Sequence, residues 1–158
     1  MLAAVISDTH LPRPTPWFES VYEQHLAAAD VLIHCGDMVG LTVYHFLLQH
    51  PNLVAVHGNT CQWGVRDQLP AAASVDLGGL RVAVTHGWGD RPGTPARVAQ
   101  ALGPDHDLVC YGHTHAPDWA QHGDVRLLNP GSLQQSAPSL ALLRLAPNAP
   151  PECRFIQP

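Results

Sequence analysis

Residues 2–56 alternate short apolar segments with helical ones, and this order restricts the fold more than any other feature of the sequence. The apolar segments 2–6, 31–34 and 53–56 are predicted strands. Segments 17–29 and 41–49 carry apolar residues at helical spacing, and Pro51 ends the second one. Strands that alternate with helices favour a parallel sheet with helical crossovers. We therefore predict an α/β fold whose first part is parallel.

The pattern changes after residue 70, where two-residue turns separate short strands. Segments 74–77 and 80–85 flank Gly78-Gly79, and segments 119–122 and 125–128 flank Gly123-Asp124, so both pairs are predicted hairpins. We also expect a helix at 94–102, strands at 107–111, 140–145 and 153–156, and a Pro-rich turn at 147–151. So many short strands favour two stacked sheets flanked by helices, within a single domain that covers residues 1–158.

Composition excludes several classes of protein. The chain has 158 residues, of which 46% are hydrophobic and 13% charged, which excludes a disordered chain or a coiled coil. The eight basic residues are all arginine and are scattered, and the formal charge is −5, so we expect no specific binding of nucleic-acid duplexes. No apolar run approaches the ~18–20 residues of a membrane span. The first residues lack the features of a signal peptide, which predicts a cytoplasmic protein with reduced thiols.

Five of the predicted strands end in side chains that can bind a metal. They belong to the runs Ser7-Asp8-Thr9-His10, Gly36-Asp37, Gly58-Asn59, Thr85-His86 and Gly112-His113-Thr114-His115. Ligands of open α/β sheets bind beyond the carboxyl ends of the strands, so we expect these side chains to converge. In the last run, alternate residues of an extended segment would both point at one centre.

Seven candidate ligands are too many for one tetrahedral ion, which takes four. They are Asp8, His10, Asp37, Asn59, His86, His113 and His115. The set suits two ions if one carboxylate bridges them. Its mixture of oxygen and nitrogen favours Mn²⁺, Fe or Zn²⁺ over Ca²⁺, which prefers all-oxygen shells.

The other histidines receive different interpretations. His34 lies just inside a strand end, where it either supports a ligand or packs in the core. We expect the remaining ones at the surface or only partly packed: His25, His45, His50, His106 and His122. Cys35 and Cys110 are predicted to be small buried apolar residues.

The ordered set of motifs resembles the calcineurin-like metallophosphoesterase superfamily. The small size and the run Asn129-Pro130-Gly131-Ser132 are similar to its compact branch of YfcE-type phosphodiesterases. The resemblance covers residues 4 to about 145 and implies a four-layer α/β/β/α sandwich of two mixed sheets, the metallo-dependent phosphatase fold.

The resemblance also implies a dinuclear centre with assigned ligands. One ion would be held by Asp8, His10, Asp37 and His115, and the other by Asp37, Asn59, His86 and His113, with Asp37 as the bridge. Mn²⁺ is the ion expected first, with Zn²⁺, Ni²⁺ and Fe as alternatives. The implied reaction is hydrolysis of a small phosphoester, in which a hydroxide that bridges the ions attacks phosphorus in line. Asp37, Asn59 and His113 are the predicted catalytic residues, and a diester is expected ahead of a monoester.

The sequence departs from the family pattern around the candidate site. Thr60-Cys61 stands where relatives place a His or Cys-Asp, and neither residue is a good acid at neutral pH, so the group that protonates the leaving group stays unassigned. His57, Thr60 and Trp88 are the predicted substrate contacts, and Trp88 either stacks on a substrate ring or packs locally. No Arg closely follows Ser132.

Two readings compete with the phosphodiesterase. A retromer subunit uses the same fold mainly to bind other proteins, so a weakly active or inactive scaffold is the first alternative. An amidohydrolase is the second, but its barrel needs a longer chain. A monomer and a homo-oligomer are both compatible with the sequence.

Overall fold

The computed structural model describes residues 1–147 and 149–158, so one position of the predicted Pro-rich turn at 147–151 lies outside the described residues. The chain forms two five-stranded sheets. The first has the order β10-β9-β1-β2-β3, with β1 (Leu2–Ile6), β2 (Val31–His34), β3 (Leu53–Ala55), β9 (Leu140–Arg144) and β10 (Glu152–Ile156). In this sheet β1 pairs in parallel with β2, and β2 with β3, as the alternating pattern predicts.

The second sheet has the order β4-β5-β6-β8-β7. Its strands are β4 (Ala72–Leu77), β5 (Leu80–Thr85), β6 (Leu108–Cys110), β7 (Pro117–His122) and β8 (Val125–Pro130). Both predicted hairpins are present, with β4 antiparallel to β5 and β7 antiparallel to β8. Strand β6 pairs in parallel with β5 and β8, so the sheet is mixed.

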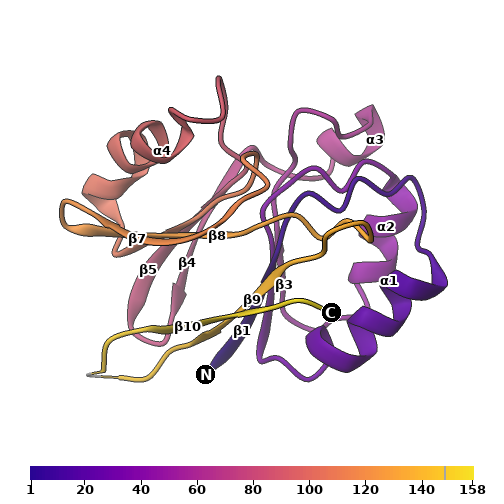
Figure 1. The fold of residues 1–158 in the computed structure, drawn as a ribbon, viewed down its shortest axis with the longest axis horizontal. Coiled ribbons are helices and arrows are strands. Elements are labelled where there is room, and N and C mark those ends of the chain that lie inside the picture. The colour runs from indigo at the N-terminus through magenta and orange to yellow at the C-terminus, as the bar shows by residue number, and fades with distance from the viewer. Residues whose placement is uncertain (148) are drawn as a thin grey trace.

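Helices cover the outer face of each sheet, which gives the four-layer α/β/β/α sandwich (Figure 1). On the first sheet lie α1 (Pro16–Val21), which continues as a π-helical turn at Tyr22–Leu26, and α2 (Leu41–Leu47). On the second lies α4 (Thr94–Leu102), followed by a 3-10 turn at Gly103–Asp105. Among the described residues, no helix is both long and apolar enough to cross a lipid bilayer.

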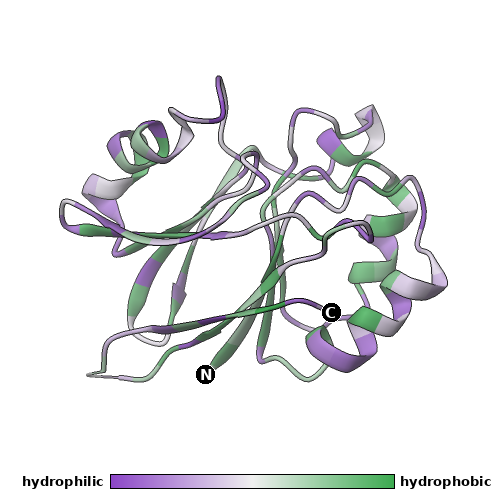
Figure 2. Cartoon of the chain, viewed as in Figure 1, coloured by the Kyte–Doolittle hydropathy of each residue, from purple (hydrophilic) through white to green (hydrophobic). Residues whose placement is uncertain are grey.

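Side chains of β1 alternate between two apolar cores. Ala4 and Ile6 pack against the helices, whereas Ala3 and Val5 pack between the sheets. Apolar residues therefore run continuously along the strand, because both of its faces are buried. Figure 2 shows this as green strands within both sheets. Cys35 and Cys110 belong to the core between the sheets, as predicted, and all four cysteines are free thiols.

Several predicted boundaries differ from the structure. The first helix ends at Leu26 instead of residue 29, because the Ala29 N–H closes a turn on the Leu26 carbonyl at 3.1 Å and the Asp30 N–H then bonds to Leu2 of β1 at 2.8 Å. A short helix, α3 (Trp63–Arg66), follows β3 and was not predicted. Its four residues are too few to show a helical period.

His50 was expected at the surface or only partly packed, and this was wrong. Its side chain is buried, with Nε2 sharing a hydrogen bond with the Ala29 carbonyl at 3.1 Å and Nδ1 accepting the Asn52 N–H at 3.2 Å. The imidazole therefore satisfies two backbone groups where the chain turns between α2 and β3. Sequence spacing did not reveal this role, because the partner Ala29 comes from another segment.

Replacing His50 with leucine is expected to lower the free energy of unfolding by about 2 kcal/mol, because it leaves buried backbone groups without partners. Urea denaturation measures this change. The matched control is His45→Leu, whose side chain is exposed on α2 and should alter stability little. Equal stabilities for the two variants would contradict a structural role for His50.

Candidate metal centre

The carboxyl ends of five strands meet at one rim of the two sheets. Loops after β1, β2 and β3 come from the first sheet, and loops after β5 and β6 from the second. These loops lie together beside α3 and α4 in Figure 1. The predicted convergence therefore occurs, and it joins both sheets at a single site.

Five of the seven predicted ligands adopt a left-handed backbone. The φ angles are 52° for Asp8, 50° for His10, 58° for Asp37, 70° for His113 and 62° for His115. Such a conformation costs roughly 1–3 kcal/mol per non-glycine residue and is concentrated at functional sites. It also corrects the expectation that His113 and His115 lie on an extended segment, because each residue instead turns the chain.

Asp8, His10 and His115 form a first group of donor atoms. Asp8 Oδ1 lies 3.1 Å from Nε2 of His115 and 3.6 Å from Nε2 of His10. The two Nε2 atoms are 3.2 Å apart. Two loops that are far apart in the sequence thus direct three donor atoms at a common point.

His86, Asp37 and Asn59 form a second group. Nε2 of His86 lies 3.3 Å from Asp37 Oδ2 and 3.2 Å from Asn59 Oδ1. The other ring nitrogen, Nδ1, lies 2.9 Å from the Cys35 carbonyl. Since a carbonyl only accepts, Nδ1 donates to it, and Nε2 is the ring nitrogen left to face Asp37 and Asn59.

Asp37 links the two groups. Its Oδ2 is 3.3 Å from Nε2 of His86 and 3.9 Å from Nε2 of His10. Its Oδ1 accepts the Thr60 N–H at 2.8 Å, which fixes the orientation of the carboxylate. One oxygen is therefore held by the backbone while the other faces both donor groups.

His113 lies beside the second group but with a different partner. Its ring contacts that of His86, with 5.2 Å between centroids, and its Nε2 donates to the Gly89 carbonyl at 2.8 Å. With Nε2 used in this way, Nδ1 is the nitrogen left for a ligand bond. The backbone N–H of His113 also donates to Asp8 Oδ2 at 3.0 Å, joining the β6 loop to the β1 loop.

The carboxylates of the centre stay ionised although they are buried. Burial alone would raise the pKa of Asp8, but the nearby imidazoles of His10 and His115 hold it well below its usual range. Burial would also raise the pKa of Asp37, but the contact with His86 favours the ionised form, and the net shift is downward. Burial lowers the pKa of His86, but its contacts with the carboxylates of Asp37 and Asp8 and with the Cys35 carbonyl together outweigh this, and the net shift is upward.

His34 supports the loops from below. Burial lowers its pKa to about 4, so the ring is neutral. Nδ1 accepts the Gly36 N–H at 3.1 Å, and Nε2 lies 3.4 Å from the Thr9 hydroxyl. The ring is thus buried and also contacts both loops that carry the predicted carboxylates, which unites the two interpretations of this residue.

Serine and asparagine side chains that were not predicted as site residues orient the centre. The Ser7 hydroxyl donates to Asp8 Oδ2 at 2.6 Å, and the Ser132 hydroxyl donates to the Asp8 carbonyl at 2.9 Å. Asn129 Nδ2 donates to the Gly112 carbonyl at 2.8 Å and to Thr114 Oγ1 at 3.0 Å. The run from Asn129 to Ser132 was noticeable as a motif, but its role emerges only when β8 lies beside the ligand loops.

The predicted substrate residues lie around the two donor groups. Thr60 Oγ1 is 3.4 Å from Nδ1 of His10. His57 and the exposed Trp88 line a cavity of about 390 Å³ that also reaches Asn59 and His86. Arg66 lines the same cavity, so a guanidinium group stands near the centre although none closely follows Ser132.

A second cavity, of about 500 Å³, lies next to the loop that carries His113 and His115. Arg91, Pro92, Thr114 and Pro117 are among the residues that line it. Nη2 of Arg91 lies 3.5 Å from Nε2 of His115, so this cavity adjoins the first donor group. Sequence reasoning missed Arg91, because it has no fixed spacing from the ligand motifs.

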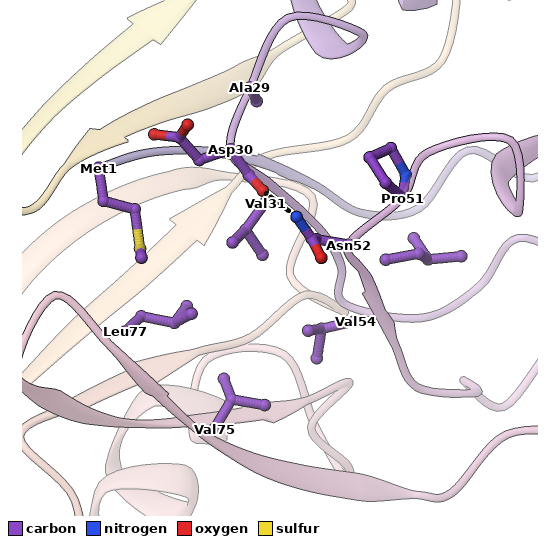
Figure 3. A pocket seen from close by; sticks show the side chains of 10 residues that line it. Met1, Ala29, Asp30, Val31, Pro51, Asn52, Val54, Val75 and Leu77 are labelled. Carbon is purple, nitrogen blue, oxygen red and sulfur yellow. Dashed lines mark hydrogen bonds between the residues drawn. The ribbon is translucent and has the colours of Figure 1, made fainter.

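A larger cavity, of about 740 Å³, lies far from these residues. Met1, Val31 and Leu53 line it at the amino ends of their strands, opposite the carboxyl ends that carry the donor groups (Figure 3). Val75 and Leu77 of β4 form its other wall. It contains none of the predicted site residues.

The donor atoms fit divalent cations. Asp8 Oδ1 is buried and has no hydrogen-bond partner among the described residues, which is costly for an ionised carboxylate. Two clusters satisfy the spacing of a metal site, namely Asp8 with His10 and His115, and Asp8 with Asp37 and His86. A cation between these atoms would compensate the orphaned oxygen.

Comparison with known proteins places this geometry in a family. The model of the calcineurin-like phosphoesterase superfamily domain matches residues 1–146. A probable metallophosphoesterase of Methanocaldococcus jannaschii is 33% identical over 135 residues, which cover 84% of this chain and 68% of that protein. A phosphodiesterase of the same archaeon is 30% identical over 145 residues, 83% of each chain.

The solved structure of vacuolar protein sorting 29 from Cryptosporidium parvum shares the fold. It superposes with a TM-score of 0.76 at 20% identity, covering 99% of this chain and 96% of the other. The predicted architecture and family resemblance are therefore confirmed. The family is metal-dependent, and its named relatives support a hydrolase. The chain belongs to the calcineurin-like phosphoesterase superfamily.

Proposed function

We propose that this chain is a phosphodiesterase that works with two divalent cations, with Mn²⁺ as the first ion to test. The position of Asp37 carries the proposal, because one carboxylate oxygen faces both donor groups. Asp8, His10, Asp37 and His115 would hold one ion, and Asp37, Asn59, His86 and His113 the other.

The chain's own residues would prepare the reaction. When bound, two cations supply an activated water for in-line attack on phosphorus and neutralise charge on the phosphoryl oxygens. Asp8 and Asp37 provide the negative charge that attracts the ions. Thr60, Cys35 and Gly89 hold Asp37, His86 and His113 in place through backbone groups. The donors are thus oriented before any ion arrives.

The two cavities beside the centre support a diester as substrate. One adjoins Asn59 and His86, and the other adjoins Arg91 and Thr114. A diester places one organic group on each side of its phosphate, whereas a monoester has only one. Trp88 offers a flat apolar surface to one of these groups.

The leaving group receives little help from the chain at Thr60-Cys61. Cys61 is buried, and its sulfur accepts the Gly58 N–H at 3.3 Å, so this thiol holds the loop. Thr60 is a poor acid at neutral pH. We therefore expect fast hydrolysis only of esters with good leaving groups.

The experiment compares an activated diester with the matching monoester, using nitrophenyl esters and Mn²⁺, Ni²⁺, Zn²⁺ or Mg²⁺. We expect metal-dependent hydrolysis that is faster for the diester and is lost with a chelator and restored by the ion. Faster cleavage of the monoester would reassign the chain as a phosphomonoesterase. Equal rates for the parent and His113→Ala would assign the activity to a contaminant.

The scaffold alternative has a clear signature in the same assay. Vacuolar protein sorting 29 shows that the fold is shared with a protein named for sorting rather than hydrolysis. A scaffold would show no turnover above the blank with Mn²⁺ present. The complete set of donor residues favours the enzyme, because hydrolysis by this route needs bound cations.

A further inference from the structure

The loop between β5 and α4, residues 86–93, is held by contacts with α4 and with the loop after β6. Arg97 of α4 donates through Nη1 to Asp90 Oδ1 at 2.7 Å and through Nε to the Trp88 carbonyl at 2.9 Å. Asp90 Oδ2 accepts the Gly93 N–H at 2.9 Å. The Gly89 carbonyl of the same loop accepts a hydrogen bond from Nε2 of His113, in the loop after β6. An exposed loop thus has a defined path over the centre.

This path brings Arg91 to the edge of the first donor group. Its Nη2 is 3.5 Å from Nε2 of His115, and its side chain lines the cavity of about 500 Å³ with Thr114 and Pro117. The residue itself is exposed. No carboxylate partner is found for Arg91 among the ion pairs of the described residues.

A guanidinium group beside the first donor group is suited to bind an anion. It carries only donors and stays charged, so it cannot bind a metal and would be repelled by one. A phosphoryl oxygen between the cation and the arginine would turn this repulsion into attraction. The planar arrangement of N–H groups also matches two phosphate oxygens.

We propose that Arg91 binds the non-bridging oxygens of the substrate phosphate, and that the Asp90–Arg97 pair is a positioning device for it. This proposal rests on the proposed function, because it takes the donor groups to be occupied by cations. It makes Arg91 a specificity-determining residue on the side of His115.

The test measures inhibition by inorganic phosphate and its binding by calorimetry to the Mn²⁺-loaded protein. Arg91→Met should weaken phosphate binding about tenfold or more and raise KM for the diester, since a charge-assisted hydrogen bond is lost. Arg91→Lys should fall between, because it keeps the charge without the fork. Affinity for Mn²⁺ should not fall, because the lost guanidinium repels the ion. Arg154→Met, exposed on β10, is the matched control.

A double-variant cycle tests the positioning role. If Arg97 acts through Arg91, the single variant Arg97→Met should weaken phosphate binding. In the Arg91→Met background the same change should cause no further loss of phosphate affinity. Additive losses would overturn this role, because they would show that Arg97 affects the site by another route.

The possible failures are distinguishable. Unchanged phosphate binding in Arg91→Met, with diester hydrolysis intact, would overturn the role of Arg91 and leave the phosphodiesterase standing. A parent that binds Mn²⁺ without hydrolysing esters would overturn the phosphodiesterase, while calorimetry with phosphate would still decide on Arg91. A parent that takes up no Mn²⁺, Zn²⁺ or Ni²⁺ would overturn both.

Discussion

Asp37→Ala should reduce kcat/KM for an activated diester by at least about a thousandfold, because losing several kcal/mol of charge stabilisation has this effect. The variant removes the one carboxylate oxygen that faces both His10 and His86. It should also reduce the number of tightly bound Mn²⁺ ions, measured by calorimetry and elemental analysis. Asp37→Asn, which keeps an acceptor for the Thr60 N–H, separates loss of charge from loss of the loop contact.

Asp124→Ala is the matched control for this loss. Asp124 lies exposed in the turn between β7 and β8, so its replacement removes one negative charge from the chain without touching the centre. Activity and Mn²⁺ stoichiometry should remain at the level of the parent. A parent and an Asp37→Ala protein that bind equal amounts of Mn²⁺ would contradict the bridging role.

Gly112→Ala is expected to lower both stability and affinity for Mn²⁺. A Cβ atom at this position would collide with the Ser7 hydroxyl and lie 2.8 Å from Asp8 Oδ2 and 2.9 Å from the Cys35 carbonyl. Backbone and buried side chains cannot yield easily, so we expect a loss of about 1–3 kcal/mol in unfolding free energy. Urea denaturation measures the stability, and Mn²⁺ titration measures the displacement of Asp8.

A second glycine provides the comparison. Gly123 lies in the turn after β7 at φ 59°, and a Cβ there meets nothing within 4 Å. Gly123→Ala should therefore cost only the left-handed strain of about 1 kcal/mol and leave Mn²⁺ affinity unchanged. If Gly112→Ala bound Mn²⁺ as tightly as the parent, the close approach of the β6 loop to Asp8 would not matter for the centre.

The fold could be predicted because its signals are local. Leu2–Ile6 is apolar throughout, and the strand is buried on both faces. The dipeptide Gly78-Gly79 is by itself a signal for the hairpin of β4 and β5. Elements that depend on tertiary contacts were missed. The short helix Trp63–Arg66 has too few residues for a periodic pattern, and within the predicted helix at 17–29 nothing marked Tyr22–Leu26 as π-helical.

The candidate site was predictable in its residues but not in its geometry. The order of Asp8, Asp37, Asn59 and His86 at strand ends predicted that they converge. The left-handed turns at the ligand positions were not foreseen, because Asp and His adopt that conformation only where the surrounding loops impose it. Arg91 lacked a signal for a related reason, since its approach to His115 depends on a loop path set by Arg97.

The hydrogen bond from Ser132 to Asp8 spans 124 positions of the chain. Leu133 likewise donates its N–H to the Ser7 carbonyl at 2.9 Å. During synthesis, β1 to β3 leave the ribosome first. At that stage the loop that carries Asp8 therefore lacks its hydrogen bonds to Ser132 and Leu133. Long-range contacts of this kind form slowly, and a chain made from the amino end must wait for them. Competence to capture a metal should consequently emerge late in translation, once the segment after β8 has left the exit tunnel.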